Sequence, residues 1–455
     1  MSRARHPLAP ALVGLAATTA LVTAPVAARA QLGSFNPPPG PQATIAIRNA
    51  RIVPVSGPEI ARGTVVVSGG KITAVGTDAA VPAGAQVLDG TGLSVYPGMM
   101  DAGTSLGLSE IPQGAASTVD VSEVGNWNPN ALAYWGVNPH SAHVGVTRVV
   151  GITHVLTRPT GGIVSGQAAL LNLAGSTVVQ MRVNERAALV IELPRSGFGG
   201  GRGFAFAAAP GGPGGAGDVQ RARTRQLDSL RAWLRDAEAY AKAQEAYAKD
   251  RTLPRPRQDV VLASLVAAAR GEQPVLFVAD RAPDIREAIA FAREMKLRPI
   301  IMGGRDAWQV ADLLKREDVP VLLGSVMDLP SREDDPFDAN YAAPAKLAAA
   351  GVRFAITSGD AGAESRNLPY VAGMAAAHGL SKADALRAVT LWPAQILGVG
   401  DRLGSIEVGK AANLVVTTGD LLEARTDTRY LIIDGRMVPL DTKHSVLNEQ
   451  FKDRP

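Results

Sequence analysis

The sequence predicts an α/β fold in which a (β/α)8 TIM barrel carries a small β-sandwich built from both chain ends. Near-continuous apolar strands alternate with amphipathic helices through the middle of the chain, which is typical of a parallel sheet covered by helices. Because these units extend over about 300 residues, eight strand–helix units closed into a barrel are expected. Short alternating strands occur near both ends of the chain, and two such segments can pair into one domain.

The barrel elements are predicted from the apolar runs in order. The expected strands are residues 99–105, 151–159, 274–280, 297–304, 319–325 and 351–360, and the expected helices are residues 283–296, 305–317 and 381–391. A longer helix is expected from Asp218, which can cap its first turn. One face of that helix carries apolar side chains, namely Leu227, Leu230, Leu234, Ala237 and Ala241.

The sandwich strands are expected in "TIAIRNARIVPVSG" and "GTVVVSGGKITAVG" near the start, and in "LGSIEVGKAANLVVTTGD" and "YLIIDGRMV" near the end. Gly69 and Gly70 separate two apolar runs at the spacing of a β-hairpin. A segment with ten glycines in 22 residues interrupts the barrel, and we expect a loop there. The predicted boundaries are 44–97 and 396–440 for the composite sandwich, 98–395 for the barrel, 196–217 for the glycine-rich insertion and 441–455 for a tail.

The N-terminus has the pattern of a cleavable secretory signal peptide over residues 1–30. Arg3, Arg5 and His6 precede an apolar run, and Ala28-Arg29-Ala30 fits a small-x-small cleavage site. Residues 31–43 then form a proline-rich linker. The alternative is an uncleaved anchor helix. We therefore expect a secreted or periplasmic protein, cut after Ala30.

Composition excludes several classes of function. The formal charge is +4, and removal of the first thirty residues leaves 43 basic residues against 42 acidic ones. This balance gives no reason to expect nucleic acid or an anionic membrane as a partner, and the glycine-rich insertion lacks the basic surroundings of an RNA-binding tract. Cysteine is absent, which excludes disulfides, thiolate metal sites and a cysteine nucleophile.

Four stretches together resemble the amidohydrolase superfamily, and most closely its imidazolonepropionase-like branch. "GTVVVSGGKITAVG" is similar to the family's N-terminal sheet, and "YPGMMDAGTSLGL" resembles its strand-one signature. "GITHVLTRPTGGIVSGQAALLNL" resembles its second strand and the Gly-Gln turn that follows. The most specific stretch is "GLSKADALRAVTLWPAQILGVGDRLGSIEVGKAANLVVTTGD", which is similar to the family's closing segment. The resemblance covers nearly all of residues 44–440.

The resemblance implies hydrolysis of C–N bonds in amides, cyclic amides or dipeptides. In the family, one or two divalent metals such as zinc activate a water molecule, because coordination lowers the pKa of water to about 7. The ligands are imidazoles and carboxylates at the carboxyl ends of barrel strands. A small-molecule ligand is therefore expected at the barrel mouth.

The family's ligand positions are not filled by histidine in this sequence. Its strand-one His-x-His falls on Gly103 and Ser105, and its strand-six histidine falls on or beside Gly303. Its strand-five position falls on Val278 or Asp280. Its strand-eight aspartate is matched by Asp360, although a gapless reading places Gly359 there. We therefore expect no cofactor, and in particular no zinc.

Three residues remain as catalytic candidates: Asp360, Asp280 and His154. His154 lies on the predicted second strand, where a lone histidine is more often structural. His140 and His143 are three residues apart, a spacing that suits a metal pair on a helix face, but Pro139 favours a loop or first turn. His378 lies beside a helix-ending glycine, and His444 lies in the tail. Asp101 matches a scaffold aspartate of the family. Serine catalysis by Ser105 or Ser358 would need a positioned base, and the sequence shows neither a nucleophile elbow nor a histidine partner.

Three functional hypotheses remain open at this point. The protein is an exported hydrolase of C–N bonds with an altered site, a catalytically inactive pseudoenzyme, or a partner subunit of an intact amidohydrolase in a homo- or hetero-oligomer. The strand, turn and helix patterns are intact, so the protein is expected to fold. Fold alone does not decide among these functions.

Overall fold

The computed structural model describes residue 36 and residues 38–111, 116–194, 216–330, 332 and 334–454. The predicted signal peptide and cleavage site, and all but the last two residues of the glycine-rich insertion, lie outside the described residues. No helix in the described ranges combines the length and the apolar composition that crossing a bilayer requires.

The first sheet joins the two ends of the chain, as predicted. Its strand order is β16-β15-β14-β5-β1-β2-β3, with β4 paired to β1. Strand β14 pairs antiparallel with β5 and so links the C-terminal strands to the N-terminal ones. Gly69 and Gly70 form the expected hairpin turn between β2 and β3, both at positive φ. The strands are β1 (Ile45–Ile52), β2 (Ile60–Ser68), β3 (Lys71–Gly76), β4 (Gln86–Asp89), β5 (Ser94–Pro97), β14 (Leu414–Thr417), β15 (Thr428–Ile433) and β16 (Arg436–Val438).

The second sheet is a nearly closed barrel of eight strands in sequence order, from β6 to β13. Strands β6 and β13 are the two ends of this order, and the loop after β13 connects them. There the backbone N–H of Ser105 donates to the carbonyl of Asp360 at 2.9 Å. The strands are β6 (Met99–Thr104), β7 (Ile152–Thr157), β8 (Val164–Asn172), β9 (Arg182–Ile191), β10 (Pro274–Ala279), β11 (Arg298–Gly303), β12 (Val321–Leu323) and β13 (Phe354–Ile356).

One strand of the barrel departs from the parallel pattern. Strand β8 pairs antiparallel with both β7 and β9, whereas a strand–helix unit was expected at this place. Gly161 and Gly162 reverse the chain after β7 with φ values of 83° and 72°. A side chain at Gly162 would meet the carbonyl oxygen of Gly125 at 2.9 Å, so the tight turn depends on glycine.

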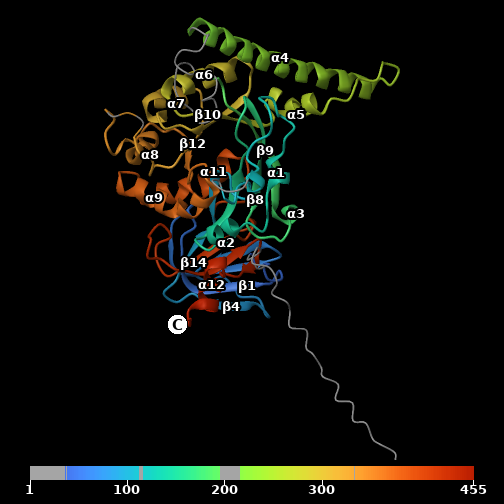
Figure 1. Ribbon diagram of the computed structural model, residues 1–455. Coiled ribbons are helices and arrows are strands. Elements are labelled where there is room, and N and C mark those ends of the chain that lie inside the picture. The colour runs from blue at the N-terminus through green and yellow to red at the C-terminus, as the bar shows by residue number, and fades with distance from the viewer. Residues whose placement is uncertain are drawn as a thin grey trace, which may run out of the picture. The chain divides into compact units, whose positions relative to one another are not determined.

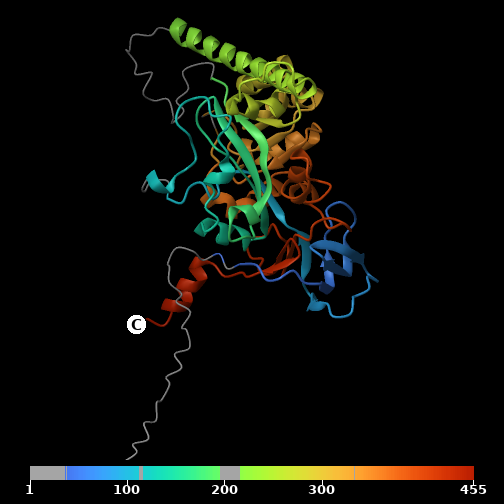
Figure 2. The ribbon, with the colours of Figure 1, turned by 90° about the vertical axis from the view of Figure 1, so that its right-hand side faces the viewer.

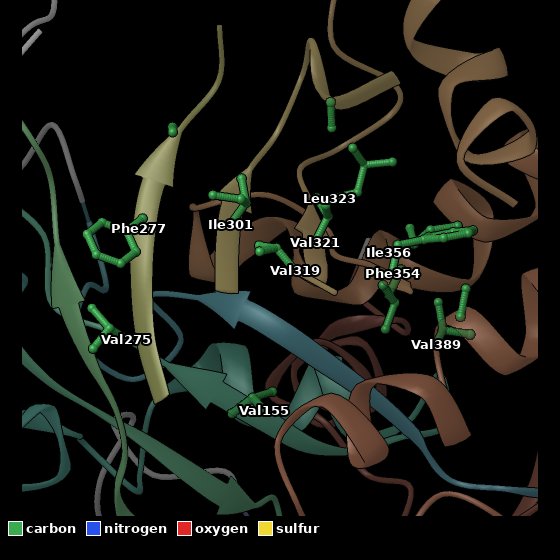
Figure 3. Close-up of a cluster of buried hydrophobic side chains, with 14 of the residues drawn as sticks. Val155, Val275, Phe277, Ile301, Val319, Val321, Leu323, Phe354, Ile356 and Val389 are labelled. Atoms are coloured by element: carbon green, nitrogen blue, oxygen red, sulfur yellow. The ribbon is translucent and has the colours of Figure 1, made fainter. Parts of the chain in front are cut away.

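Alternate residues of the barrel strands fill two separate cores. The barrel interior is packed by Leu276, Ile300, Met302, Leu322 and Ala355 together with residues of β6 to β9. Their sequence neighbours face outward and pack beneath the helices, as Phe277, Ile301 and Ile356 do in Figure 3. This alternation is the two-residue period of strands, and it makes the barrel a packed core with chemistry confined to its ends.

Helices cover the outside of the barrel (Figures 1 and 2). The predicted helices are confirmed as α6, α7 with the preceding short helix Ala307–Val310, and α10. The long helix α4 begins at Ala216, so Asp218 lies within it, and its predicted apolar face is buried. The helices are α1 (Ala133–Gly136), α2 (Ala142–Arg148), α3 (Val178–Met181), α4 (Ala216–Lys249), α5 (Val260–Ala269), α6 (Ala282–Glu294), α7 (Ala311–Arg316), α8 (Ala339–Ala349), α9 (Leu368–Ala377), α10 (Lys382–Ala388), α11 (Leu391–Ile396) and α12 (Lys443–Phe451).

Candidate functional site

A cavity of about 280 Å³ lies at the carboxyl ends of the barrel strands. The segments that follow β7, β10, β11, β12 and β13 each contribute to its wall. This is the end of a barrel at which loops from successive strands converge and at which ligand sites are built. Its charged lining residues are Arg158, Asp280, Arg305, Asp328, Asp360 and Glu364.

The pair Arg158–Asp360 joins the segments that follow β7 and β13, the two strands on either side of β6 at the barrel mouth. Arg158 directly follows β7, and its guanidinium Nη2 donates to the carboxylate of Asp360 after β13. The Arg158 side chain is 4% exposed, whereas that of Asp360 is 69% exposed. The Nε of Arg158 is buried and has no hydrogen-bond partner among the described residues. A buried guanidinium with an unused donor can bind an oxygen atom of a ligand.

Further carboxylates give the cavity a mixed charge. Arg305 lies 3.4 Å from Asp328. The pKa of Asp328 is raised, chiefly because the carboxyl is partly buried and also because Asp360 lies nearby, although Arg305 opposes the shift. The four carboxylates and two guanidiniums named above leave an excess of negative charge when ionised. Such a lining suits a ligand that carries a positive group together with oxygen acceptors.

A buried polar network lies beside the cavity where β6 meets the loop after β13. Asp101 in β6 is completely buried. It accepts hydrogen bonds from the backbone N–H of Ser358 at 3.2 Å and from the Ser358 hydroxyl. Ser365 Oγ lies 2.8 Å from Thr104 Oγ1 in the same region. Burial raises the pKa of Asp101 to about 6, although hydrogen bonds from Ser358, Ser365 and Gly103 oppose the shift.

Two of the three predicted site residues come together. Asp280 and Asp360 both line the cavity, as expected for residues at the ends of barrel strands. His154 is not among the residues that line it. It lies near the start of β7, 2% exposed, with Nδ1 2.9 Å from Thr153 Oγ1. Burial lowers the pKa of His154 to about 4, opposed by the charge of Asp434 in the turn between β15 and β16.

The remaining histidines occupy structural positions. His143 lies in the first turn of α2, and its Nε2 is 3.1 Å from the carbonyl oxygen of Glu110. His378 ends α9 and stacks on Tyr341 with ring centroids 4.8 Å apart. His140 precedes α2, and His444 lies in the C-terminal helix α12.

The positions at which the resemblance places metal ligands do not fit a divalent metal. A Cβ atom at Gly103 would overlap Met302 Cε and lie 2.9 Å from its sulfur. A Cβ atom at Gly303 would lie 2.5 Å from a carboxylate oxygen of Asp280, and Gly303 has a φ of 96°. Within the described ranges, no three His, Cys, Asp or Glu side chains are grouped so that they could hold a metal ion.

Sequence reasoning missed Arg158 as a site residue and Asp101 as the partner of Ser358. The signal for Arg158 was its position at the end of the apolar run "GITHVLTRP", whereas Asp280 and Asp360 were predicted from the ligand positions of the family that the sequence resembles. The contact between Asp101 and Ser358 spans 257 positions of the chain, and a single sequence does not reveal such a pairing.

A wide groove of about 910 Å³ lies elsewhere, lined by residues that include Val55, Arg387, Trp392 and Lys410. The cationic side chains of this groove already make hydrogen bonds within the protein. Lys410 Nζ donates to the carbonyl of Gly400 at 2.7 Å and to the hydroxyl of Ser405 at 2.6 Å. Arg387 Nε donates to the carbonyl of Val55 at 3.0 Å. The barrel mouth, with the unused donor of Arg158, is therefore the better candidate site.

Comparison with known proteins points to one superfamily. Residues 277–438 match the family model described as the amidohydrolase family. An amidohydrolase from Thermotoga maritima superposes with a TM-score of 0.75 and 25% sequence identity, over 87% of this chain and 99% of that one. No curated protein matches the sequence.

Two further structures share the fold at lower identity. A prolidase crystallised with N-methylphosphonate-L-proline gives a TM-score of 0.53 and 19% identity, over 87% of this chain and 99% of that one. A molinate hydrolase gives a TM-score of 0.53 and 16% identity, over 89% and 96% of the two chains.

Proposed function

This chain belongs to the amidohydrolase superfamily, and we propose that the mouth of its barrel binds a small dipeptide-like or amide ligand without a divalent metal. We propose further that it belongs to the imidazolonepropionase-like branch, which the sequence motifs resemble most closely. The metal-free part of the proposal rests on the residues at the expected ligand positions, Gly103, Ser105 and Gly303. None of them offers an imidazole or a carboxylate to a metal.

The main observation in support of this proposal is the ion pair between Arg158 and Asp360. Asp360 matches the family's strand-eight aspartate, and here its carboxylate accepts from a buried guanidinium. A guanidinium beside that carboxylate opposes binding of a divalent cation at the same place by charge repulsion. The family's metal is thus replaced by a cation of the protein itself.

The cavity also indicates the chemical class of the ligand. Its volume of about 280 Å³ lies just below the range for small-molecule sites, which runs from about 300 to 1,000 Å³, so the ligand must be small. The guanidiniums of Arg158 and Arg305 can donate to carbonyl or carboxylate oxygens of a ligand. Asp280, Asp328 and Asp360 can accept from its ammonium group. A zwitterionic dipeptide meets both requirements.

Calorimetric titration of the EDTA-treated protein with a panel of uncharged-side-chain dipeptides tests the proposal. We expect binding without added metal. Replacing Arg158 by Ala should weaken it about 10- to 100-fold, the equivalent of one charged hydrogen bond. Arg353→Ala is the matched control, because Arg353 pairs with Asp318 at 2.9 Å on the exposed surface. Binding that appears only after zinc is added, or that is equal in both variants, would contradict the proposal.

We also propose that the protein is exported after cleavage behind Ala30. The support is the N-terminal pattern of basic residues, apolar run and small-x-small site. The test is N-terminal sequencing of the protein recovered from the periplasmic fraction of a bacterial host. A chain beginning at Gln31 is expected, and a full-length chain confined to the cytoplasm would contradict export.

A further inference from the structure

Ser358 is the hydroxyl-bearing residue that connects the mouth cavity with a buried carboxylate. It lines the cavity, and its hydroxyl donates to Asp101. The backbone N–H of Ser358 also donates to Asp101, at 3.2 Å, which fixes the serine with respect to the carboxylate. A nucleophile and a base within hydrogen-bond reach form the minimal arrangement for covalent catalysis.

We propose that Ser358 is the nucleophile of a metal-free acyl transfer in this cavity, with Asp101 as its general base. The inference rests on the proposed function, because it assigns a reaction to the site that binds the amide or dipeptide ligand. It replaces the metal-activated water of the superfamily with a serine hydroxyl activated by a buried carboxylate.

Asp101 has the surroundings that a base needs. It is fully buried in β6, and hydrogen bonds from Ser358, Ser365 and the backbone at Gly103 hold it in one orientation. Its pKa of about 6 leaves it ionised at neutral pH and close to the value at which a general base is most effective. A carboxylate of ordinary pKa would be a weaker base in the same position.

The proposed reaction balances within the protein, the ligand and water. The Ser358 Oγ attacks the acyl carbon while its proton passes to Asp101. The C–N bond then breaks, and the proton from Asp101 goes to the departing amine. A water molecule next attacks the acyl-serine, giving its proton to Asp101, and Asp101 returns that proton to the Ser358 oxygen as the carboxylic acid leaves.

Arg158 supplies the remaining group that such a reaction needs. Its buried Nε has no partner among the described residues, and its side chain lines the same cavity as Ser358. A fixed cationic donor of this kind stabilises the negative charge that develops on the acyl oxygen. Asp360 holds the guanidinium from its other side.

The test is reaction of the intact protein with a fluorophosphonate probe, followed by peptide mapping. Attack by the serine forms an Oγ–P bond and releases fluoride, so the label should map to Ser358. Ser358→Ala should abolish labelling, and Asp101→Asn should slow it by about 100-fold or more, the contribution of a general base. Ser105→Ala is the matched control and should label at the wild-type rate, because the Ser105 hydroxyl accepts from the backbone N–H of Gly362 and does not line the cavity.

The outcomes separate this inference from the proposed function. Label on a serine other than Ser358, or no label at all, overturns the nucleophile assignment even when dipeptides bind in the titration. Because mapping of the wild-type protein gives this result directly, the test does not depend on the folding of the Asp101→Asn variant. Loss of dipeptide binding itself would instead remove the proposed function.

Discussion

The two ends of the barrel use polar residues in different ways. At the start of the strands, His154 is 2% exposed and its ring is hydrogen-bonded to Thr153. Near it, Asn172 donates to Asp434 in the turn between β15 and β16 at 3.3 Å. At the mouth, by contrast, Asp360 is mostly exposed, and Arg158 retains a donor without a partner among the described residues.

This contrast teaches that residue type alone does not identify the site. Histidine is the usual catalyst and metal ligand, yet the one on a barrel strand here is buried and hydrogen-bonded to Thr153. The charged groups that line the mouth cavity are arginine, aspartate and glutamate. The candidate chemistry therefore belongs to the mouth, and the polar groups at the opposite end stabilise the fold.

The largest expected effect concerns the interior just inside the mouth. Met302 is 1% exposed and occupies the space next to Gly103. Replacing it by Ala should lower the free energy of unfolding by about 2–5 kcal/mol, because a cavity is left in a packed core. Met327→Ala is the control, since Met327 is 45% exposed and should change stability by less than about 0.5 kcal/mol. Urea unfolding measures both, and equal small effects would show that the interior near Gly103 is loosely filled.

The pH dependence of stability should differ in sign between the two ends. The pKa of His154 is lowered to about 4 in the folded protein, so its stabilising contribution is present above the unfolded value of about 6.5 and is lost as pH falls toward 4. The pKa of Asp101 is raised to about 6. Its contribution is present below about 3.9 and is lost as pH rises through 6.

Unfolding of single variants at several pH values separates these two contributions. Each group changes the free energy of unfolding by roughly 3 kcal/mol across its pH range, because its pKa is shifted by about two units on folding. Relative to wild type, His154→Gln should gain stability as pH falls from 7 to 4.5, whereas Asp101→Asn should lose stability over the same range. If the free energy of unfolding varies with pH in the same way for wild type and both variants, neither group is buried as described.

The smallest effect is expected at the exposed rim of the mouth. Arg305→Ala removes the partner of Asp328 and should change stability by less than about 1 kcal/mol, because the pair is solvated. It should also raise the pKa of Asp328 further, since Arg305 now opposes the upward shift. NMR titration of the Asp328 carboxyl measures this, and an unchanged pKa would remove the proposed coupling.

Much of this architecture could be predicted because it depends on local patterns. The apolar face of α4 and the pairing of the two chain ends followed from periodicity alone. The antiparallel direction of β8 did not, because an apolar strand in a hairpin has the same composition as one in a parallel sheet. Its reversal depends on the turn at Gly161 and Gly162.

Residues of the site could be predicted only where their position along a strand determines whether they reach the barrel mouth. Asp280 and Asp360 match ligand positions of the family at the ends of strands, so their place at the mouth could be inferred. His154 lies early in β7, and the length of the strand beyond it determines that it does not line the mouth. Met302 fills the space beside Gly103, and Asp101 contacts Ser358. Both contacts join residues that are far apart in sequence.

The central claim is that this barrel mouth works without a bound divalent metal. The most direct test is the metal content of the untagged protein after purification in the presence of zinc, measured by inductively coupled plasma mass spectrometry. The account predicts zinc far below one ion per chain, with dipeptide binding intact in the same sample. Zinc close to one ion per chain, lost together with binding on treatment with EDTA, would contradict it.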